Sequence, residues 1–178
     1  HLHKHPELSK KEYLTAEKIK EFLLDNPPDQ ILEGIGKTGL VAIYRGKNPG
    51  KTIMIRADID ALPITEINNF EYASINQNVS HKCGHDGHTT ILAGLSIILK
   101  ENPIESGRVV LLFQPAEETG EVAAQVLTDQ RFTDLKPDYV FALHNLPGFG
   151  LSKIVIRNKH FAAASKGMII KLTGKTSH

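Results

Sequence analysis

Short apolar runs alternate with helical patterns along most of this chain. Five runs have the length of β-strands, and turn residues or polar clusters bound them; they are residues 30–34, 39–45, 52–55, 109–113 and 139–143. The last three are continuously apolar, as strands buried on both faces of a parallel sheet are. This pattern predicts a sheet with buried parallel strands at its centre.

Three segments have the periodicity of helices. Residues 13–24 place apolar side chains on one face, residues 88–100 are apolar almost all round, and residues 119–127 predict a shorter helix. Ser9 and Glu12 have the spacing of a capping box in front of the first helix. Strands that alternate with helices favour an α/β fold with three α/β/α layers and a mostly parallel sheet.

The pattern of apolar and polar residues changes beyond Gly150. Residues 153–157 and 168–173 alternate apolar with polar side chains, which is typical of antiparallel strands with one solvated face. We therefore expect residues 1–166 to belong to one domain and residues 167–178 to begin a second, smaller α+β domain. The chain does not begin with methionine and stops within a strand-like pattern, which indicates a fragment of a longer protein.

Composition excludes few classes of protein. A net charge of +1 over 178 residues gives no electrostatic argument for nucleic acid or a membrane surface. No apolar run approaches the roughly 20 residues that a membrane-spanning helix needs. Cys83 has no second cysteine to pair with, so it is free, a metal ligand or catalytic. An unpaired cysteine suits a reducing cytoplasm, which is the compartment we expect.

Polar clusters follow three of the apolar runs and one long aperiodic loop at residues 62–82. Ligands and reacting groups gather at the carboxyl ends of strands in open α/β sheets. We expect these clusters to meet there, and they are Arg56–Asp60, Cys83–His88, Gln114–Glu118 and Ala142–Asn145.

The cluster after the loop carries a thiol and an imidazole two residues apart. Cys83 and His85 are both good ligands for zinc or a similar divalent ion. A buried cysteine beside a surface histidine is the alternative interpretation of this pair alone. Asp86 and His88 lie within the same six residues and favour the metal site.

Glu117 and Glu118 are adjacent carboxylates at the end of an apolar run. One interpretation is structural, because acidic residues suit the first turn of a helix. In the functional interpretation the two carboxylates have different roles. One ligates a metal, and its neighbour acts as general base toward metal-bound water.

Two further strand ends carry possible site residues. His144 ends the last apolar run, where it is either a ligand or a histidine satisfied by local hydrogen bonds. Asp58 or Asp60 could orient a metal-bound imidazole without touching the metal. Arg56 could pair with either carboxylate, which would be a structural role.

Together these motifs resemble those of a known family. The segments that carry the resemblance occur in the same order there, and they are HPELS at residues 5–9, RADIDALP at 56–63, CGHDGH at 83–88, QPAEE at 114–118 and LHN at 143–145. The chain resembles the M20 metallopeptidases, specifically the aminoacylase-like amidohydrolases. That group includes hippurate hydrolases, plant auxin–amino acid conjugate hydrolases and bacterial N-acyl-amino acid deacylases.

The resemblance implies a zinc-peptidase-like fold and a site for two divalent metal ions. Zinc is the expected metal, with manganese, cobalt or nickel as alternatives. Cys83, His85, Glu118 and His144 correspond to metal ligands, and the Cys83 thiolate could serve both ions.

The resemblance also implies catalytic roles. Glu117 corresponds to the general base, and Asp58 to an acid that supports the site. His178 corresponds to a histidine of the smaller lid domain that donates to the oxyanion, often across a homodimer interface. Relatives carry one more histidine ligand in a second half of the catalytic domain, and neither that half nor most of the lid is present in this chain.

The implied reaction is hydrolysis of the amide bond of N-acyl amino acids by hydroxide formed on the metal. The implied partner is a small-molecule substrate, with no nucleic acid or membrane, and we expect this fragment to be inactive alone. Two alternatives stay open: a hydrolase that uses Cys83 as nucleophile, and a metal-binding relative without catalytic activity. The sequence does not indicate which acyl group or amino acid is preferred.

Overall fold

A computed structural model describes residues 1–162 and 168–175 of this chain. The chain divides into two compact units, residues 1–145 and residues 146–178, which are considered separately. The first unit contains all the helices and strands found in the described residues. None of these helices is long and apolar enough to span a membrane.

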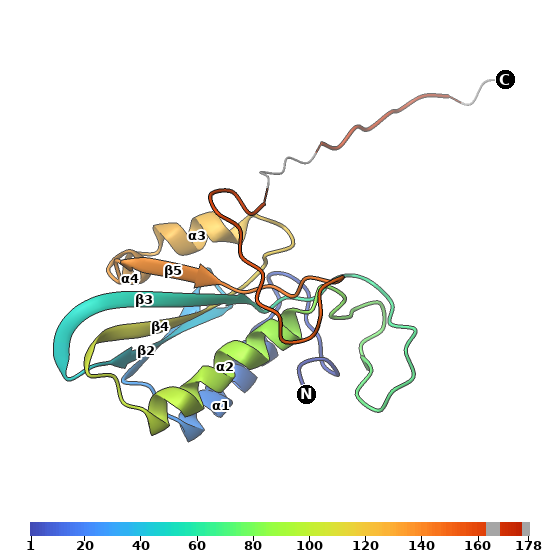
Figure 1. Ribbon diagram of the computed structural model, residues 1–178. Helices are drawn as coiled ribbons and strands as arrows, with labels where there is room; N and C mark the ends of the chain where they lie inside the picture. Colours follow the sequence, from blue (N-terminus) through green and yellow to red (C-terminus); the bar gives the residue numbers. More distant parts are fainter. Residues whose placement is uncertain (163–167, 176–178) are drawn as a thin grey trace. The chain divides into compact units, whose positions relative to one another are not determined.

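A five-stranded sheet forms the centre of the first unit (Figure 1). All five predicted strands are present, in the spatial order β1-β2-β4-β3-β5. Their bounds are β1 Gln30–Ile35, β2 Gly39–Arg45, β3 Asn48–Asp58, β4 Ser106–Gln114 and β5 Tyr139–Ala142.

The sheet is mixed, which corrects the expectation of a mostly parallel one. β3 pairs in parallel with β4 and β5, but β2 pairs antiparallel with both β1 and β4. A tight turn with positive φ at Gly36 and Lys37 joins β1 to β2, and so short a connection permits only an antiparallel pair. The three continuously apolar runs were predicted to form parallel strands. They correspond to β3, β4 and β5, which do pair in parallel.

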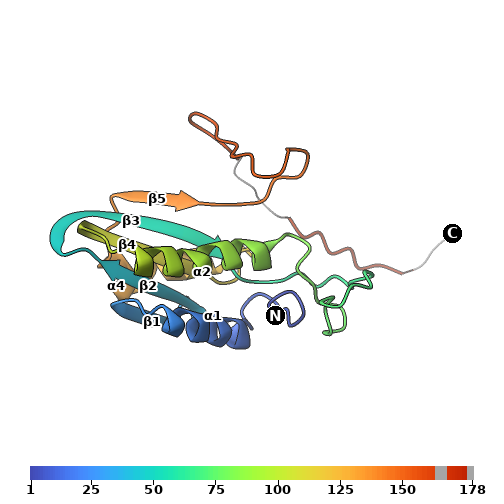
Figure 2. The same cartoon turned by 60° about the horizontal axis from the view of Figure 1, so that its bottom comes forward.

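Helices cover both faces of this sheet, as the three-layer prediction requires. α1 and α2 lie on one face and α3 on the other (Figure 1), and Figure 2 shows α1 and α2 on the same face. The helices are α1 Tyr13–Asp25, α2 His85–Glu101, α3 Val122–Thr128 and the short α4 Gln130–Thr133.

Each face has its own apolar core. On one face, Leu23 of α1 and Leu92 of α2 pack in a cluster that includes Phe113. On the other face, Val122 and Val126 of α3 belong to a cluster that includes Met54 of β3. The central strands are therefore buried on both sides, which explains their unbroken apolar sequence.

The capping box predicted at Ser9 and Glu12 is wrong. Glu12 occupies the N-cap position of α1, but its side chain does not cap the helix, and the Glu7 carboxylate accepts from the Thr15 N–H of the first turn at 2.7 Å instead. Ser9 instead donates to Asp60, and the Glu12 carboxylate accepts from Thr38 and from the backbone of Ala116. These residues are engaged by tertiary partners rather than by the helix end.

The second unit contains no helix or strand in its described residues, 146–162 and 168–175. The strands predicted at residues 153–157 and 168–173 are therefore wrong. A strand needs a neighbour for its backbone hydrogen bonds, and no described segment pairs with either stretch. The predicted domain boundary at residues 166 and 167 lies outside the described residues and stays a prediction.

Candidate metal centre

The predicted polar clusters meet at the carboxyl ends of the parallel strands. The register places Asp58 beside Gln114, and Arg56 of β3 beside Ala142 of β5. Consequently the segments that follow β3, β4 and β5 leave the sheet at one edge. The first turn of α2, which begins at His85, reaches the same edge.

His85 is fully buried, and only one of its ring nitrogens is engaged. Its Nδ1–H donates to the backbone oxygen of Asp60 at 2.9 Å, with the Asp60 carboxylate 3.2 Å away. Its Nε2 has no hydrogen-bond partner among the described residues. That nitrogen lies 3.6 Å from Asp58 Oδ2 and 3.7 Å from Glu118 Oε1. A buried, unpaired imidazole nitrogen that faces carboxylates is available to bind a metal ion.

His88 lies one turn further along α2 and is engaged on both sides. Its Nδ1 lies 2.6 Å from Asp58 Oδ1, and its Nε2 accepts from the backbone N–H of Asn145 at 2.9 Å. Arg56 donates to the other carboxylate oxygen of Asp58 at 2.9 Å. His88 therefore has no lone pair left for a metal, and it fixes Asp58 and the segment after β5.

Cys83 and His144 face each other across the opening of the site. The Cys83 Sγ lies 3.6 Å from His144 Nε2, and His144 Nδ1–H donates to the Asn145 carbonyl at 2.8 Å. Between Cys83 and His85, Gly84 has a φ of +92°, and an added Cβ would come within 2.7 Å of the Asn145 side chain. Glycine is therefore needed here, both for the backbone conformation and for the close approach of Asn145.

Candidate donor atoms lie in two overlapping groups, although the ring nitrogens of His88 are already engaged as described above. Cys83, His85 and Glu118 form one group; Asp58, His85, His88 and His144 form the other, and within each group the donor atoms lie within 4.8 Å of one another. Ligand atoms around a tetrahedral zinc ion stand roughly 3.4–3.6 Å apart, given Zn–N and Zn–S bond lengths of about 2.0–2.3 Å. The 3.6 and 3.7 Å separations above are close to this spacing.

The electrostatics of the cluster favour a cation. Burial lowers the pKa of His85, but Asp60, Asp58 and Glu118 outweigh it and raise the pKa. Burial and the nearby Glu118, Asp58 and Glu117 raise the pKa of the Cys83 thiol to about 11. The carboxylates around both groups thus create a negative field, and a bound cation would displace a proton from each.

Asp58 itself stays ionised. Burial raises its pKa, but the hydrogen bond from His88 and the charges of Arg56 and His85 outweigh burial and lower the pKa to about 2. Asp58 is therefore a permanent anion between an arginine and two histidines. The supporting role that the sequence predicted for Asp58 stays a prediction.

The model of peptidase family M20/M25/M40 matches residues 54–163 of the sequence, which is more than half of the chain. The chain belongs to this family. Its matched region contains every residue of the metal centre described above. The predicted family resemblance is confirmed.

Relatives of this M20 chain include deacylases of amino acids. It is 40% identical to the N-acetyl-L-cysteine deacetylase of Bacillus subtilis, over 100% of this chain and 42% of that protein. It is 38% identical to the hippurate hydrolase of Campylobacter jejuni, over 99% of this chain and 46% of that protein. The chain thus spans about half the length of the curated relatives that it matches.

A solved structure of the same family has a similar fold. The YxeP protein of Bacillus subtilis, described as a dinuclear metal binding peptidase from the M20 family, superimposes with a TM-score of 0.75. The match has 41% identity and covers 83% of this chain and 41% of that one. The α/β architecture of the first unit is therefore that of M20 peptidases.

The structure brings together most of the predicted site residues in this family member. Cys83, His85, Glu118 and His144 converge as expected, and Asp58 lies among them. Glu117 is half-buried beside Glu118, close enough for its charge to raise the Cys83 pKa. The remaining predicted residue, His178, lies outside the described residues, so its role stays a prediction.

Sequence reasoning gave Asn145 and His88 no separate role, whereas it named Asp60, like Asp58, as a carboxylate that could orient an imidazole. Asn145 holds His88 through its backbone N–H and accepts from His144 through its carbonyl. The only sequence signal was its place directly after a candidate ligand. The contact between Asn145 and His88 joins residues 57 positions apart along the chain, so no local pattern could reveal it.

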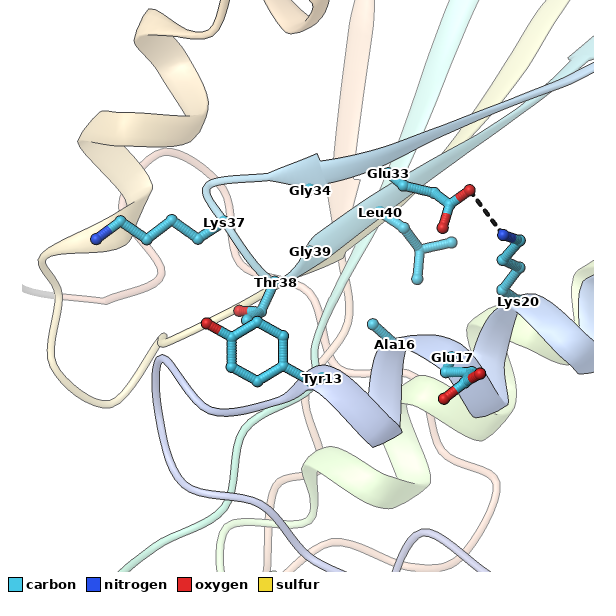
Figure 3. A pocket seen from close by; sticks show the side chains of 10 residues that line it. All are labelled: Tyr13, Ala16, Glu17, Lys20, Glu33, Gly34, Lys37, Thr38, Gly39 and Leu40. Atoms are coloured by element: carbon cyan, nitrogen blue, oxygen red, sulfur yellow. Dashed lines mark hydrogen bonds and ion pairs between the residues drawn. The ribbon is translucent and has the colours of Figure 1, made fainter.

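A pocket elsewhere in the first unit is unrelated to the metal centre. Figure 3 shows it between α1 and the β1–β2 hairpin, where Lys20 pairs with Glu33 at 2.8 Å. None of the donor residues lines it. The pocket in Figure 3 is thus separate from the candidate metal centre.

Proposed function

We propose that the protein containing this chain hydrolyses the amide bond of N-acyl amino acids. In this proposal two divalent metal ions, zinc by preference, are held by Cys83, His85, Glu118 and His144. The observation that carries the proposal is the buried His85 Nε2, which has no hydrogen-bond partner within residues 1–162 and 168–175 and faces two carboxylates. The deacetylase and hydrolase relatives support the substrate class.

Bound ions would act as Lewis acids that polarise the amide carbonyl and bring the pKa of a water toward neutrality. Glu117 would take a proton from the attacking water and pass it to the leaving amine nitrogen. One C–O bond forms as the C–N bond breaks, which releases a carboxylic acid and a free amino acid. Asp60 and Asp58 would keep the imidazoles of His85 and His88 in fixed orientations.

The raised pKa of Cys83 argues against a metal-free cysteine hydrolase. A nucleophilic cysteine needs a pKa near or below neutrality, which cationic neighbours provide. Here the neighbours Glu118, Asp58 and Glu117 are anionic and raise the thiol pKa to about 11. The thiol is therefore suited to a metal, whose charge would stabilise the thiolate.

The test of this proposal is the substitution Glu117→Gln in the full-length protein, assayed on N-acetyl and N-benzoyl amino acids. Loss of a general base is expected to lower kcat by about 10²- to 10⁴-fold. Metal content, measured by mass spectrometry, is expected to stay at the wild-type level, because Glu117 is not a ligand. Exposed Glu121, four residues further on, provides the matched control Glu121→Gln, which should keep full activity.

Two results would contradict the proposal. A wild-type protein that binds metal but hydrolyses no member of a broad N-acyl panel would support a non-catalytic relative. A Glu117→Gln variant with unchanged kcat would remove Glu117 as the base. The predicted homodimer and the predicted cytoplasmic location are independent of both results and stay predictions.

A further inference from the structure

The two acidic residues of the centre follow a residue with unusual backbone geometry. Ala116 directly precedes Glu117 and Glu118, is fully buried, and has a φ of +49°. L-amino acids other than Asn and Asp rarely adopt this left-handed conformation, because Cβ crowds the following carbonyl oxygen. Something outside the segment must hold Ala116 in this state, since its own sequence does not favour it.

The residue that holds it is Glu12, at the start of α1. The Glu12 side chain is fully buried, and its Oε1 accepts from the Ala116 N–H at 2.7 Å. Its Oε2 accepts from the buried hydroxyl of Thr38 at 2.6 Å. Both oxygens of the carboxylate are thus satisfied, and neither contacts the helix that Glu12 introduces.

A second buried carboxylate holds the other side of Glu117. Asp60 Oδ2 accepts from the Glu118 N–H at 3.1 Å and from the Ser9 hydroxyl at 2.6 Å. The backbone amides before and after Glu117 are therefore each bonded to a carboxylate from a distant part of the chain. Asp60 also orients His85, so it links this segment to the ligand on α2.

The support behind Ala116 is close-packed. A Cβ added at Gly39 would lie 2.5 Å from the ring of Pro115, and one added at Gly36 would lie 2.7 Å from a methyl group of Val122. The β1–β2 turn, which includes Thr38, therefore leaves no space into which Pro115 and Ala116 could shift. Figure 3 shows Thr38 and Gly39 side by side at this turn.

We propose that Glu12 is a positioning residue for the Glu117–Glu118 pair. Its buried carboxylate maintains the left-handed conformation of Ala116, and this conformation sets the direction in which the next two carboxylates enter the metal centre. The inference rests on the proposed function for its catalytic consequence. Its structural part, the hold on Ala116, stands independently of any activity.

The test compares Glu12→Ala, Glu12→Gln and Thr38→Val in the full-length protein. Glutamine keeps an oxygen for the Ala116 N–H, whereas alanine leaves that buried N–H unpaired. Thr38→Val removes the other hydrogen bond of Glu12 and serves as the control for lost stability alone. We expect Glu12→Ala to lower kcat by about 10- to 100-fold, in the range seen when a supporting residue of a metal site is lost. We expect KM to change less than kcat, Glu12→Gln to stay close to wild type, and Thr38→Val to lower Tm without lowering kcat.

Two readouts do not depend on turnover. In the metal-free protein, hydrogen exchange of the peptide that contains Ala116 should be faster in Glu12→Ala than in Thr38→Val. In the cobalt-loaded protein, the visible absorption of Co²⁺ should change in Glu12→Ala, because displaced Glu118 alters the coordination. Adding Ala116→Gly to Glu12→Ala should restore part of kcat, since glycine adopts a positive φ without steric cost.

The proposal is overturned if Glu12→Ala and Thr38→Val lose the same Tm while kcat, the cobalt spectrum and amide exchange stay alike. It is also overturned if Glu12→Gln loses as much activity as Glu12→Ala. If Glu12→Ala does not fold, Glu12→Asp takes its place, because its shorter side chain draws the carboxylate away from the Ala116 N–H, and the same changes in kcat, the cobalt spectrum and amide exchange are expected of it. A wild-type protein that neither binds metal nor hydrolyses substrate would refute the proposed function, and amide exchange would still decide the hold on Ala116.

Discussion

The two sides of the metal centre differ in how their side chains are held. The floor of the site (Asp58, Asp60 and His88) is buried, and each of these residues has several hydrogen-bond partners. The rim (Cys83, Glu118 and His144) is more exposed. His85 joins the two, with one nitrogen bound to the floor and the other free toward the rim.

This difference separates side chains that are open to a metal from side chains that are already engaged, and it leads us to predict ligands in the rim and supports in the floor. A metal requires free lone pairs, so a side chain whose donors and acceptors are all engaged cannot ligate without losing bonds. Residues that orient ligands need the opposite, namely strong contacts that do not change on binding. His85 and His88 lie three residues apart and both are buried, yet only His85 has a free nitrogen.

Among substitutions that test the difference between floor and rim, we expect the largest effect to be on metal affinity. His88→Ala removes a support and should weaken zinc binding by about 10- to 100-fold, measured by competition with a chelator. His85→Ala removes a ligand from both donor groups, so its loss of affinity should exceed that of His88→Ala. Equal losses in the two variants would contradict the division into rim and floor.

The sequence predicted the convergence of this site because the relevant signals are local. Three unbroken apolar runs indicated parallel strands, and the ends of such strands meet at one edge of a sheet. Glu118 and His144 lie at or beside those ends, so their meeting follows from the strand assignment, whereas Cys83 and His85 follow the loop at residues 62–82 and were placed there by their motif. All five strands could be recognised for the same reason, because each is a run of neighbouring apolar residues.

The sequence could not predict roles that depend on distant contacts. Glu12 has the local spacing of a capping box, but its actual partner Ala116 is 104 residues away. His88 resembles a ligand in the motif, and only the contacts with Asp58 and Asn145 show that both of its nitrogens are engaged. The alternation at residues 153–157 predicted a strand, but no described segment pairs with it.

A smaller effect is expected on the acid stability of the metal-free protein. The pKa of Asp58 is lowered from 3.8 to about 2 in the folded state. A lowered pKa stabilises the fold above the unfolded-state value, and that stability is lost as pH falls from about 4 to about 2. The loss amounts to about 2.5 kcal/mol at most, at 1.36 kcal/mol per pKa unit.

Urea unfolding at pH 5 and at pH 2.5 measures this contribution. The difference in unfolding free energy between the two pH values should be smaller in Asp58→Asn than in the wild type. Asp25→Asn, at the exposed end of α1, is the control and should leave the difference unchanged. An unchanged difference in Asp58→Asn would show that the floor does not hold Asp58 as an anion.

Metal content tests the central claim most directly, namely that the rim side chains and the Nε2 atom of His85 hold metal. The full-length protein would be stripped, reloaded with zinc, desalted and analysed by mass spectrometry, beside Cys83→Ser and His88→Ala. The account predicts close to two zinc ions per chain in the wild type, and a clear loss in Cys83→Ser. His88→Ala should still fill at saturating zinc, because it lacks only a support. A wild-type protein that retains no zinc, or a Cys83→Ser variant that retains as much as wild type, would contradict the account.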